Sequence, residues 1–166
     1  MISGEGGTDI IKGLGGNDTL RNQTDNRFSG RPSALYGGAG DDLFYGSTGS
    51  ADTFQGGRGV DTVSFAPLSS GVVVTLDGIP NDGVPGMDAD VADDIERIIG
   101  TNFEDTITGG DANDTLVGGL GSDHLFGLAG NDTLSGQGGA DDLDGGLGVD
   151  TCSQGGGVGT IVNCEA

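Results

Sequence analysis

A period of nine residues runs through most of this chain and restricts it to a repetitive, stacked fold. From Gly100 to Val162 the sequence divides without a gap into seven units of nine residues. Earlier units begin at Gly4, Gly13, Gly37 and Gly56, and residues 46–55 form a unit with one extra residue. Such a short, fixed period is typical of a solenoid, in which each unit packs only against its neighbours along one axis.

Two positions of the unit keep their chemical character. The sixth is aspartate in Asp9, Asp18, Asp42, Asp52, Asp61, Asp105, Asp114, Asp123, Asp132, Asp141 and Asp150. The eighth is apolar in Ile11, Leu20, Phe44, Phe54, Val63, Ile107, Leu116, Leu125, Leu134, Leu143, Cys152 and Ile161. The units follow the pattern G-G-x-G-x-D-x-U-x, where U is apolar. Because glycine permits positive φ angles, the first six positions predict a turn, and the last three predict a short strand whose eighth side chain points inward.

Stacking of these units predicts an all-β parallel β-roll with two units in each coil and a turn on either side. Successive turns on one side would lie about 4.8 Å apart. Each stacked pair of turns offers two carboxylates and several backbone carbonyls, a set of oxygen ligands of the kind that Ca²⁺ prefers. Complete pairs are Asp105/Asp123, Asp123/Asp141, Asp114/Asp132, Asp132/Asp150, Asp18/Asp42 and Asp42/Asp61. We therefore predict about six calcium ions between the turns, with others at the ends.

Composition explains why such a chain needs metal ions. Glycine supplies 37 residues, aromatic residues make up 5% and tryptophan is absent, so little apolar surface is available for a core. The net charge of −20 opposes compaction. A disordered acidic tail has a similar composition, but it does not require a fixed period. The acidic balance argues against nucleic acid and anionic lipid as partners, and no apolar run approaches the roughly 18 residues of a membrane span.

The units resemble those of the RTX (repeat-in-toxin) family of secreted bacterial proteins, over nearly the whole chain. The resemblance implies a right-handed parallel β-roll that is unfolded without calcium and folds after export into calcium-rich surroundings. It also implies an extracellular, non-enzymatic module of a larger secreted or surface protein. Because repeat sequence begins almost at Met1 without a secretory leader, we expect the chain to be a piece of such a protein. We expect it to be monomeric.

The period divides the chain into three segments. Residues 1–64 form a first block with an insertion at 22–36, residues 65–99 form a linking segment, and residues 100–166 form a second block with a C-terminal cap. In the linking segment, the alternation from Gly71 predicts a strand. The acidic loop 77–94 fits either one more calcium site or a solvated loop. It does not fit an EF-hand, because the twelfth residue from Asp88 is Ile99 rather than glutamate.

Two single residues refine this scheme. Residues 91–99 also fit the nine-residue frame, which would place Glu96 at a sixth position and let it begin the second ladder of carboxylates. Gly159 occupies the sixth position of the last unit, so we expect the ladder to end there.

Two cysteines, Cys152 and Cys164, flank the last turn. Cys152 occupies an inward eighth position. Two free buried thiols are one interpretation, but in an extracellular protein a disulfide that caps the end of the roll is favoured. A zinc site lacks a nearby histidine.

The sequence offers few of the residues that catalysis or ligand binding would need. The single histidine, His124, falls at an outward seventh position without a base partner for a nucleophile, so nucleophilic catalysis lacks its parts. Threonine recurs at that position, but His124 and Asp142 interrupt the row that an ice-binding adhesin would need. The main alternative is a polysaccharide-binding or cell-surface-binding module. Against a polyanionic glycan, 26 acidic residues outnumber six cations, which are Lys12, Arg21, Arg27, Arg31, Arg58 and Arg97.

Overall fold

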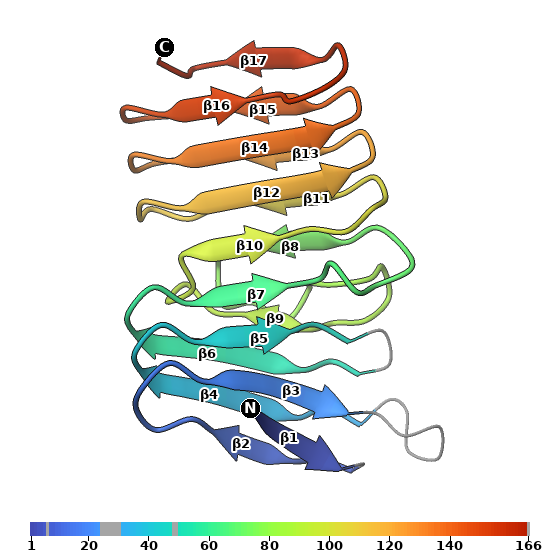
Figure 1. Ribbon diagram of the computed structural model, residues 1–166, viewed down its shortest axis with the longest axis vertical. Helices are drawn as coiled ribbons and strands as arrows, with labels where there is room; N and C mark the ends of the chain where they lie inside the picture. Colours follow the sequence, from blue (N-terminus) through green and yellow to red (C-terminus); the bar gives the residue numbers. More distant parts are fainter. Residues whose placement is uncertain (6, 24–30, 48–49, 166) are drawn as a thin grey trace.

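The computed structural model describes residues 1–5, 7–23, 31–47 and 50–165, and in these residues every regular element is a strand. The strands form three parallel sheets, and within each sheet successive strands follow one another along the long axis of the roll (Figure 1). No helix long and apolar enough to cross a membrane occurs in the described residues. The chain is therefore an all-β parallel β-roll, as the period predicted.

One face of the roll is a continuous sheet of eight strands. In spatial order these are β1 (Ile2–Glu5), β3 (Thr19–Gln23), β5 (Leu43–Tyr45), β7 (Thr62–Ser64), β10 (Arg97–Ile99), β12 (Thr115–Leu120), β14 (Thr133–Gly138) and β16 (Thr151–Ser153). Every neighbouring pair in this sheet is parallel.

The opposite face consists of two shorter sheets. The first contains β2 (Ile10–Lys12), β4 (Ala34–Ala39), β6 (Thr53–Arg58) and β9 (Asp90–Val91). The second contains β8 (Val73–Thr75), β11 (Thr106–Thr108), β13 (His124–Phe126), β15 (Asp142–Asp144) and β17 (Thr160–Val162). Figure 1 shows these strands running behind the eight-stranded face and in the opposite direction.

The register confirms that two units make one coil. Leu116 pairs with Leu134 on one face, and Leu125 pairs with Leu143 on the other, so equivalent positions recur after two units. The side chains at these eighth positions fill the interior and are at most 1% exposed. Phe44 and Phe54 meet across the interior, edge to face, with ring centroids 6.0 Å apart. At the C-terminal end the burial fails, and Ile161 is 45% exposed.

Part of the predicted insertion 22–36 belongs to a regular coil. Leu35 pairs with Ile11 on one side and with Phe54 on the other, so it occupies an eighth position and is fully buried. This register places Ser33 at a sixth position, where the pattern would have aspartate. Residues 24–30 lie outside the described part of the chain, and Arg27 is among them.

The linking segment reverses the order of two strands. The strand predicted from Gly71 is β8, which pairs with β11 of the second block. The strand β9 comes later in the sequence but pairs, in parallel, with β6 of the first block. Asp82, in the loop between them, is 1% exposed and accepts the N–H of Thr75 at 2.7 Å and the N–H of Val91 at 2.8 Å. This carboxylate therefore joins the two shorter sheets where the second face divides.

Replacement of this carboxylate should weaken the junction between the two halves of the roll. Asp82→Ala leaves the amides of Thr75 and Val91 without their acceptor, and we expect it to lower the free energy of unfolding by about 2 kcal/mol. Thermal unfolding in saturating calcium measures the change. Asp88→Ala, an exposed residue of the same loop, is the matched control. Equal stability of the two variants would contradict a clamping role for Asp82.

Candidate metal centre

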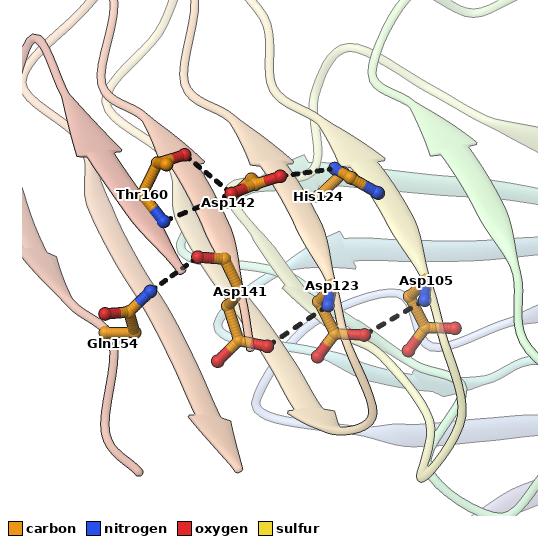
Figure 2. A network of polar contacts seen from close by, with 7 residues as sticks. All are labelled: Asp105, Asp123, His124, Asp141, Asp142, Gln154 and Thr160. Carbon is orange, nitrogen blue, oxygen red and sulfur yellow. Dashed lines mark hydrogen bonds and ion pairs between the residues drawn. The ribbon is translucent and has the colours of Figure 1, made fainter. Parts of the chain in front are cut away.

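In the stacked turns, the backbone N–H of one sixth-position aspartate donates a hydrogen bond to the carboxylate of the aspartate one coil further on. The N–H of Asp114 donates to Oδ1 of Asp132 at 2.8 Å, and the N–H of Asp132 donates to Oδ1 of Asp150 at 2.8 Å. On the other side of the roll the same bonds run from Asp105 to Asp123 and from Asp123 to Asp141, at 2.9 and 3.1 Å (Figure 2). The first block repeats the arrangement in Asp18/Asp42 and Asp42/Asp61, both at 2.8 Å. All six pairs expected from the sequence are thus stacked.

The second oxygen of most of these carboxylates is buried and unsatisfied. Oδ2 has no hydrogen-bond partner among the described residues in Asp9, Asp42, Asp61, Asp123, Asp132, Asp141 and Asp150. A buried anionic oxygen without a partner is strongly unfavourable, so a row of them requires a compensating charge. A bound cation supplies that charge.

Glycine at the first position keeps the space beside this oxygen open. A Cβ added to Gly127 would collide with Oδ2 of Asp132 and with the carbonyl oxygen of Gly145 in the next coil. Side chains larger than hydrogen would therefore occupy the place where carboxylate and carbonyl oxygens converge. The sixth-position aspartate and the first-position glycine serve one purpose, which is to gather oxygen atoms between turns.

The donor set fits calcium better than a softer metal. In the described part of the chain, no three or more His, Cys, Asp or Glu side chains converge as metal-binding groups do. Each pair of turns supplies only two carboxylates, so the other ligands of a bound ion have to be backbone carbonyls. Such an all-oxygen shell suits a hard cation of flexible coordination, which is the chemistry of Ca²⁺.

Burial favours the protonated form of some of the stacked carboxylates when no metal is bound. It raises the pKa of Asp123 to about 7, and the neighbouring charges of Asp105 and Asp141 add to the effect. Burial likewise raises the pKa of Asp61 and Asp114 to about 6. Protons therefore compete with calcium for these oxygens near neutral pH.

This competition predicts a pH dependence with a definite sign. In the calcium-free fold these pKa values lie above the ordinary aspartate value of 3.8. The metal-free fold is thus most stable below about pH 4 and loses stability as pH rises towards 7. Calcium binding releases the protons, so the midpoint of a calcium titration should be several-fold higher at pH 5.5 than at pH 7.5. A titration followed by circular dichroism at both pH values checks this, and an unchanged midpoint would contradict it.

Asp52 lacks the stacked aspartate partner that the paired sixth-position aspartates have. Its Oδ1 accepts the N–H of Ser33 at 2.9 Å and the side-chain amide of Asn22 at 3.0 Å, and its Oδ2 accepts the hydroxyl of Ser47 at 2.9 Å. Protein donors therefore satisfy both of its oxygens, as they also do in Asp105, which accepts the N–H of Val72 and the N–H of Thr101. Asp9, two coils away from Asp52, donates its N–H to the hydroxyl of Ser33 instead of to a carboxylate. The side of the first block that the insertion interrupts thus has no pair of stacked aspartates in its described residues.

Two glutamates continue the ladder of carboxylates. The N–H of Asp61 donates to Oε2 of Glu96 at 2.8 Å, so the frame of residues 91–99 is correct and carries the ladder through the linking segment. The N–H of Asp150 donates to Oε2 of Glu165 at 2.6 Å, which the sequence did not indicate because Glu165 does not fall at a sixth position. On the other side of the roll, Thr160 donates its N–H to the backbone of Asp141, and Gly159 brings no carboxylate to the last coil.

The acidic loop uses some of its charges as backbone acceptors. Besides Asp82, Asp94 accepts the N–H of Gly56 and the N–H of Gly57, each at 3.0 Å. Asp77 accepts the N–H of Ile79 at 2.9 Å and thereby shapes a tight turn. These contacts give the loop a structural role at the junction.

The two cysteines form the disulfide favoured by the sequence. Cys152 lies in β16 and Cys164 follows β17, with Cα atoms 5.9 Å apart. The bridge therefore ties the end of the chain to the preceding coil.

His124 belongs to an outward row on the second face. Its Nδ1 lies 3.5 Å from Asp142 Oδ2, and Asp142 accepts the hydroxyl of Thr160 at 2.6 Å (Figure 2). The hydrogen bond from Thr160 is the main reason that the pKa of Asp142 lies below its usual range. The row lies on the opposite surface of the strands from the interior and consists of exposed side chains.

A family comparison agrees with this geometry. The family described as RTX calcium-binding nonapeptide repeat matches four stretches of the chain, residues 1–21, 34–50, 92–125 and 117–152. No curated protein matches the chain. The matched stretches contain most of the stacked turns described above. The chain belongs to the family of RTX calcium-binding nonapeptide-repeat proteins, as a calcium-binding β-roll module.

Proposed function

We propose that this chain is a calcium-folded structural module of a larger secreted or surface protein of a bacterium. Ions between the stacked turns would supply the folding free energy that its glycine-rich interior lacks. The observation that carries the proposal is the row of buried Oδ2 atoms without partners in the described residues. The proposed ligands are the aspartates of the six stacked pairs, which are Asp18, Asp42, Asp61, Asp105, Asp114, Asp123, Asp132, Asp141 and Asp150.

The proposal is not extended to every sixth-position aspartate. Asp52 has no aspartate stacked on it, since it accepts the N–H of Ser33, and a calcium ion there would also have to displace three donors. Asp9 keeps a buried Oδ2 but faces Ser33 rather than a second carboxylate. Fewer anionic ligands mean weaker binding, so we place Asp9 at most in a weak site.

Calcium dependence suits a protein that has to cross a membrane unfolded. Extracellular calcium modules typically bind with dissociation constants of about 10⁻⁴–10⁻³ M, well above cytosolic calcium levels. The module would then stay unfolded where it is made and fold where calcium is abundant. RTX repeat proteins are typically secreted by bacteria, and the Cys152–Cys164 disulfide is consistent with an oxidising compartment.

Equilibrium dialysis against radioactive calcium tests the proposal. At 2 mM free calcium, about the level of extracellular fluids, we expect about six or more ions per chain. Magnesium at the same concentration should leave most of these ions in place, because Mg²⁺ demands a tighter octahedral shell and sheds water reluctantly. Absence of saturable calcium binding would overturn the proposed function.

A further inference from the structure

The three residues that follow β17 imitate a complete turn. Asn163, Cys164 and Glu165 lie against the turn formed by residues 145–150. The N–H of Glu165 donates to the carbonyl of Asp150 at 2.8 Å, and the N–H of Asp150 donates to Oε2 of Glu165 at 2.6 Å. Glu165 thus offers Asp150 the acceptor that, in the six stacked pairs, comes from an aspartate one coil further on.

The same three residues also replace the first position of a unit. In an ordinary coil the first-position glycine faces its own aspartate and the carbonyl of the next first position, as Gly109 faces Asp114 and Gly127. At the end of the roll, Gly145 faces Oδ2 of Asp150 and the carbonyl oxygen of Asn163. Carbonyl and carboxylate oxygens therefore surround this last gap as they surround the earlier ones.

A second observation points to a ligand in this gap. Asp150 is 1% exposed, and its Oδ2 is buried without a hydrogen-bond partner among the residues that the structure describes. Glu165 uses one oxygen for the amide of Asp150, and its side chain is exposed, so its carboxylate can turn its other oxygen towards the gap. An unpaired buried anion beside a second carboxylate is a site for a divalent cation.

We propose that Asp150, Glu165 and the carbonyl of Asn163 form a terminal calcium site that the Cys152–Cys164 disulfide holds in place. The inference rests on the proposed function, since it assigns one more ion of the same kind. It adds a site outside the nine-residue pattern and makes that site sensitive to oxidation state.

The disulfide acts through the position of the ligands. Cys164 lies between Asn163 and Glu165 in sequence, and its bridge to β16 fixes both against the preceding turn. The ordinary turns gain the same order from the strands on either side of them, which pair along the sheet. Without the bridge, residues 163–165 would keep the backbone hydrogen bond to Asp150. Calcium binding would then have to order the carbonyl of Asn163 and the side chain of Glu165, and the entropic cost of this ordering would weaken binding.

Reduction provides the first arm of the test. Dithiothreitol converts the bridge to two thiols by transfer of two electrons and two protons, and is itself oxidised to a cyclic disulfide. Bound calcium is counted by equilibrium dialysis of the oxidised and the reduced chain. We expect the reduced chain, and the double variant Cys152→Ser with Cys164→Ser, to bind one ion fewer or to bind it at least tenfold more weakly.

Glu165→Gln provides the second arm and keeps the bridge intact. We expect this variant to lose the same ion, and reduction should then change its count no further, because both changes remove one site. Glu104→Gln is the matched control, since it removes the same charge from an exposed side chain in another turn. It should keep the full count and its response to reduction.

Two results would overturn the inference while leaving the proposed function intact. One is an oxidised Glu165→Gln chain that binds as many ions, as tightly, as the unchanged chain. The other is reduction that removes an ion even from Glu165→Gln, since the bridge would then act at a different site. Failure of the unchanged chain to bind any calcium would instead overturn the proposed function itself.

Discussion

Removal of calcium is expected to abolish most of the β-structure of this chain. In the two repeat blocks the interior is essentially one row of eighth-position side chains along each sheet, and 37 glycines add backbone entropy to the unfolded state. Folding also buries the carboxylates and brings like charges together, and burial first and the neighbouring charges second raise the pKa of Asp123 to about 7. At neutral pH without metal, the chain entropy and the cost of burying carboxylates close together should exceed the free energy gained by burying the few apolar side chains. Far-ultraviolet circular dichroism at pH 7.5, in EGTA and then in excess calcium, measures the effect.

The control for this experiment replaces calcium with magnesium at the same ionic strength. Magnesium added to the EGTA-treated chain should restore little of the signal, whereas excess calcium should restore all of it. A chain that keeps the same β-spectrum in EGTA would contradict coupled folding, even if it still bound calcium.

The second large effect is expected from Asp132→Asn. Asp132 is 1% exposed and belongs to two stacked pairs, since it accepts the amide of Asp114 and donates its own to Asp150. The substitution removes one charged ligand from two adjacent sites at nearly constant shape. With about 1.5–3 kcal/mol for each charge-assisted interaction, each site should weaken roughly ten- to a hundredfold. The calcium midpoint of folding should rise accordingly.

Asp111→Asn is the matched control for this prediction. Asp111 lies in the turn that precedes β12, and its side chain is exposed, so the same change of charge occurs outside the stacked pairs. Its calcium midpoint should stay within about twofold of the unchanged chain, because exposed charges interact weakly. Equal midpoints for the two variants would contradict the pairing of aspartates across coils.

The regular parts of the roll could be predicted from the sequence because each position repeats its environment. The apolar eighth position of Leu116, Leu125 or Leu134 has one possible direction in a stacked coil, and all three are fully buried. Once two units form a coil, the partner of each aspartate follows by counting. The six stacked pairs were obtained in this way, whereas the Cys152–Cys164 bridge was favoured because the repeats indicate an extracellular protein.

The irregular parts depend on tertiary contacts that the period does not contain. Ser33 could have been found, because Leu35 continues the eighth-position row and fixes the frame of its unit. The reversal of β8 and β9 could not, since it depends on Asp82 meeting amides from both strands. Glu165 could not be found from the pattern either. It is only the third residue after β17, yet its carboxylate lies where the sixth residue of a turn normally places aspartate.

The most direct test of the central claim is anomalous scattering from crystals grown with millimolar calcium. The account predicts anomalous difference peaks between the turns of the six stacked pairs, each about 2.3–2.6 Å from carboxylate and carbonyl oxygens. The peak beside Asp132 should lie within reach of its Oδ2, the atom that has no other partner in the described structure. A well-ordered roll whose turns contain only water would contradict the account.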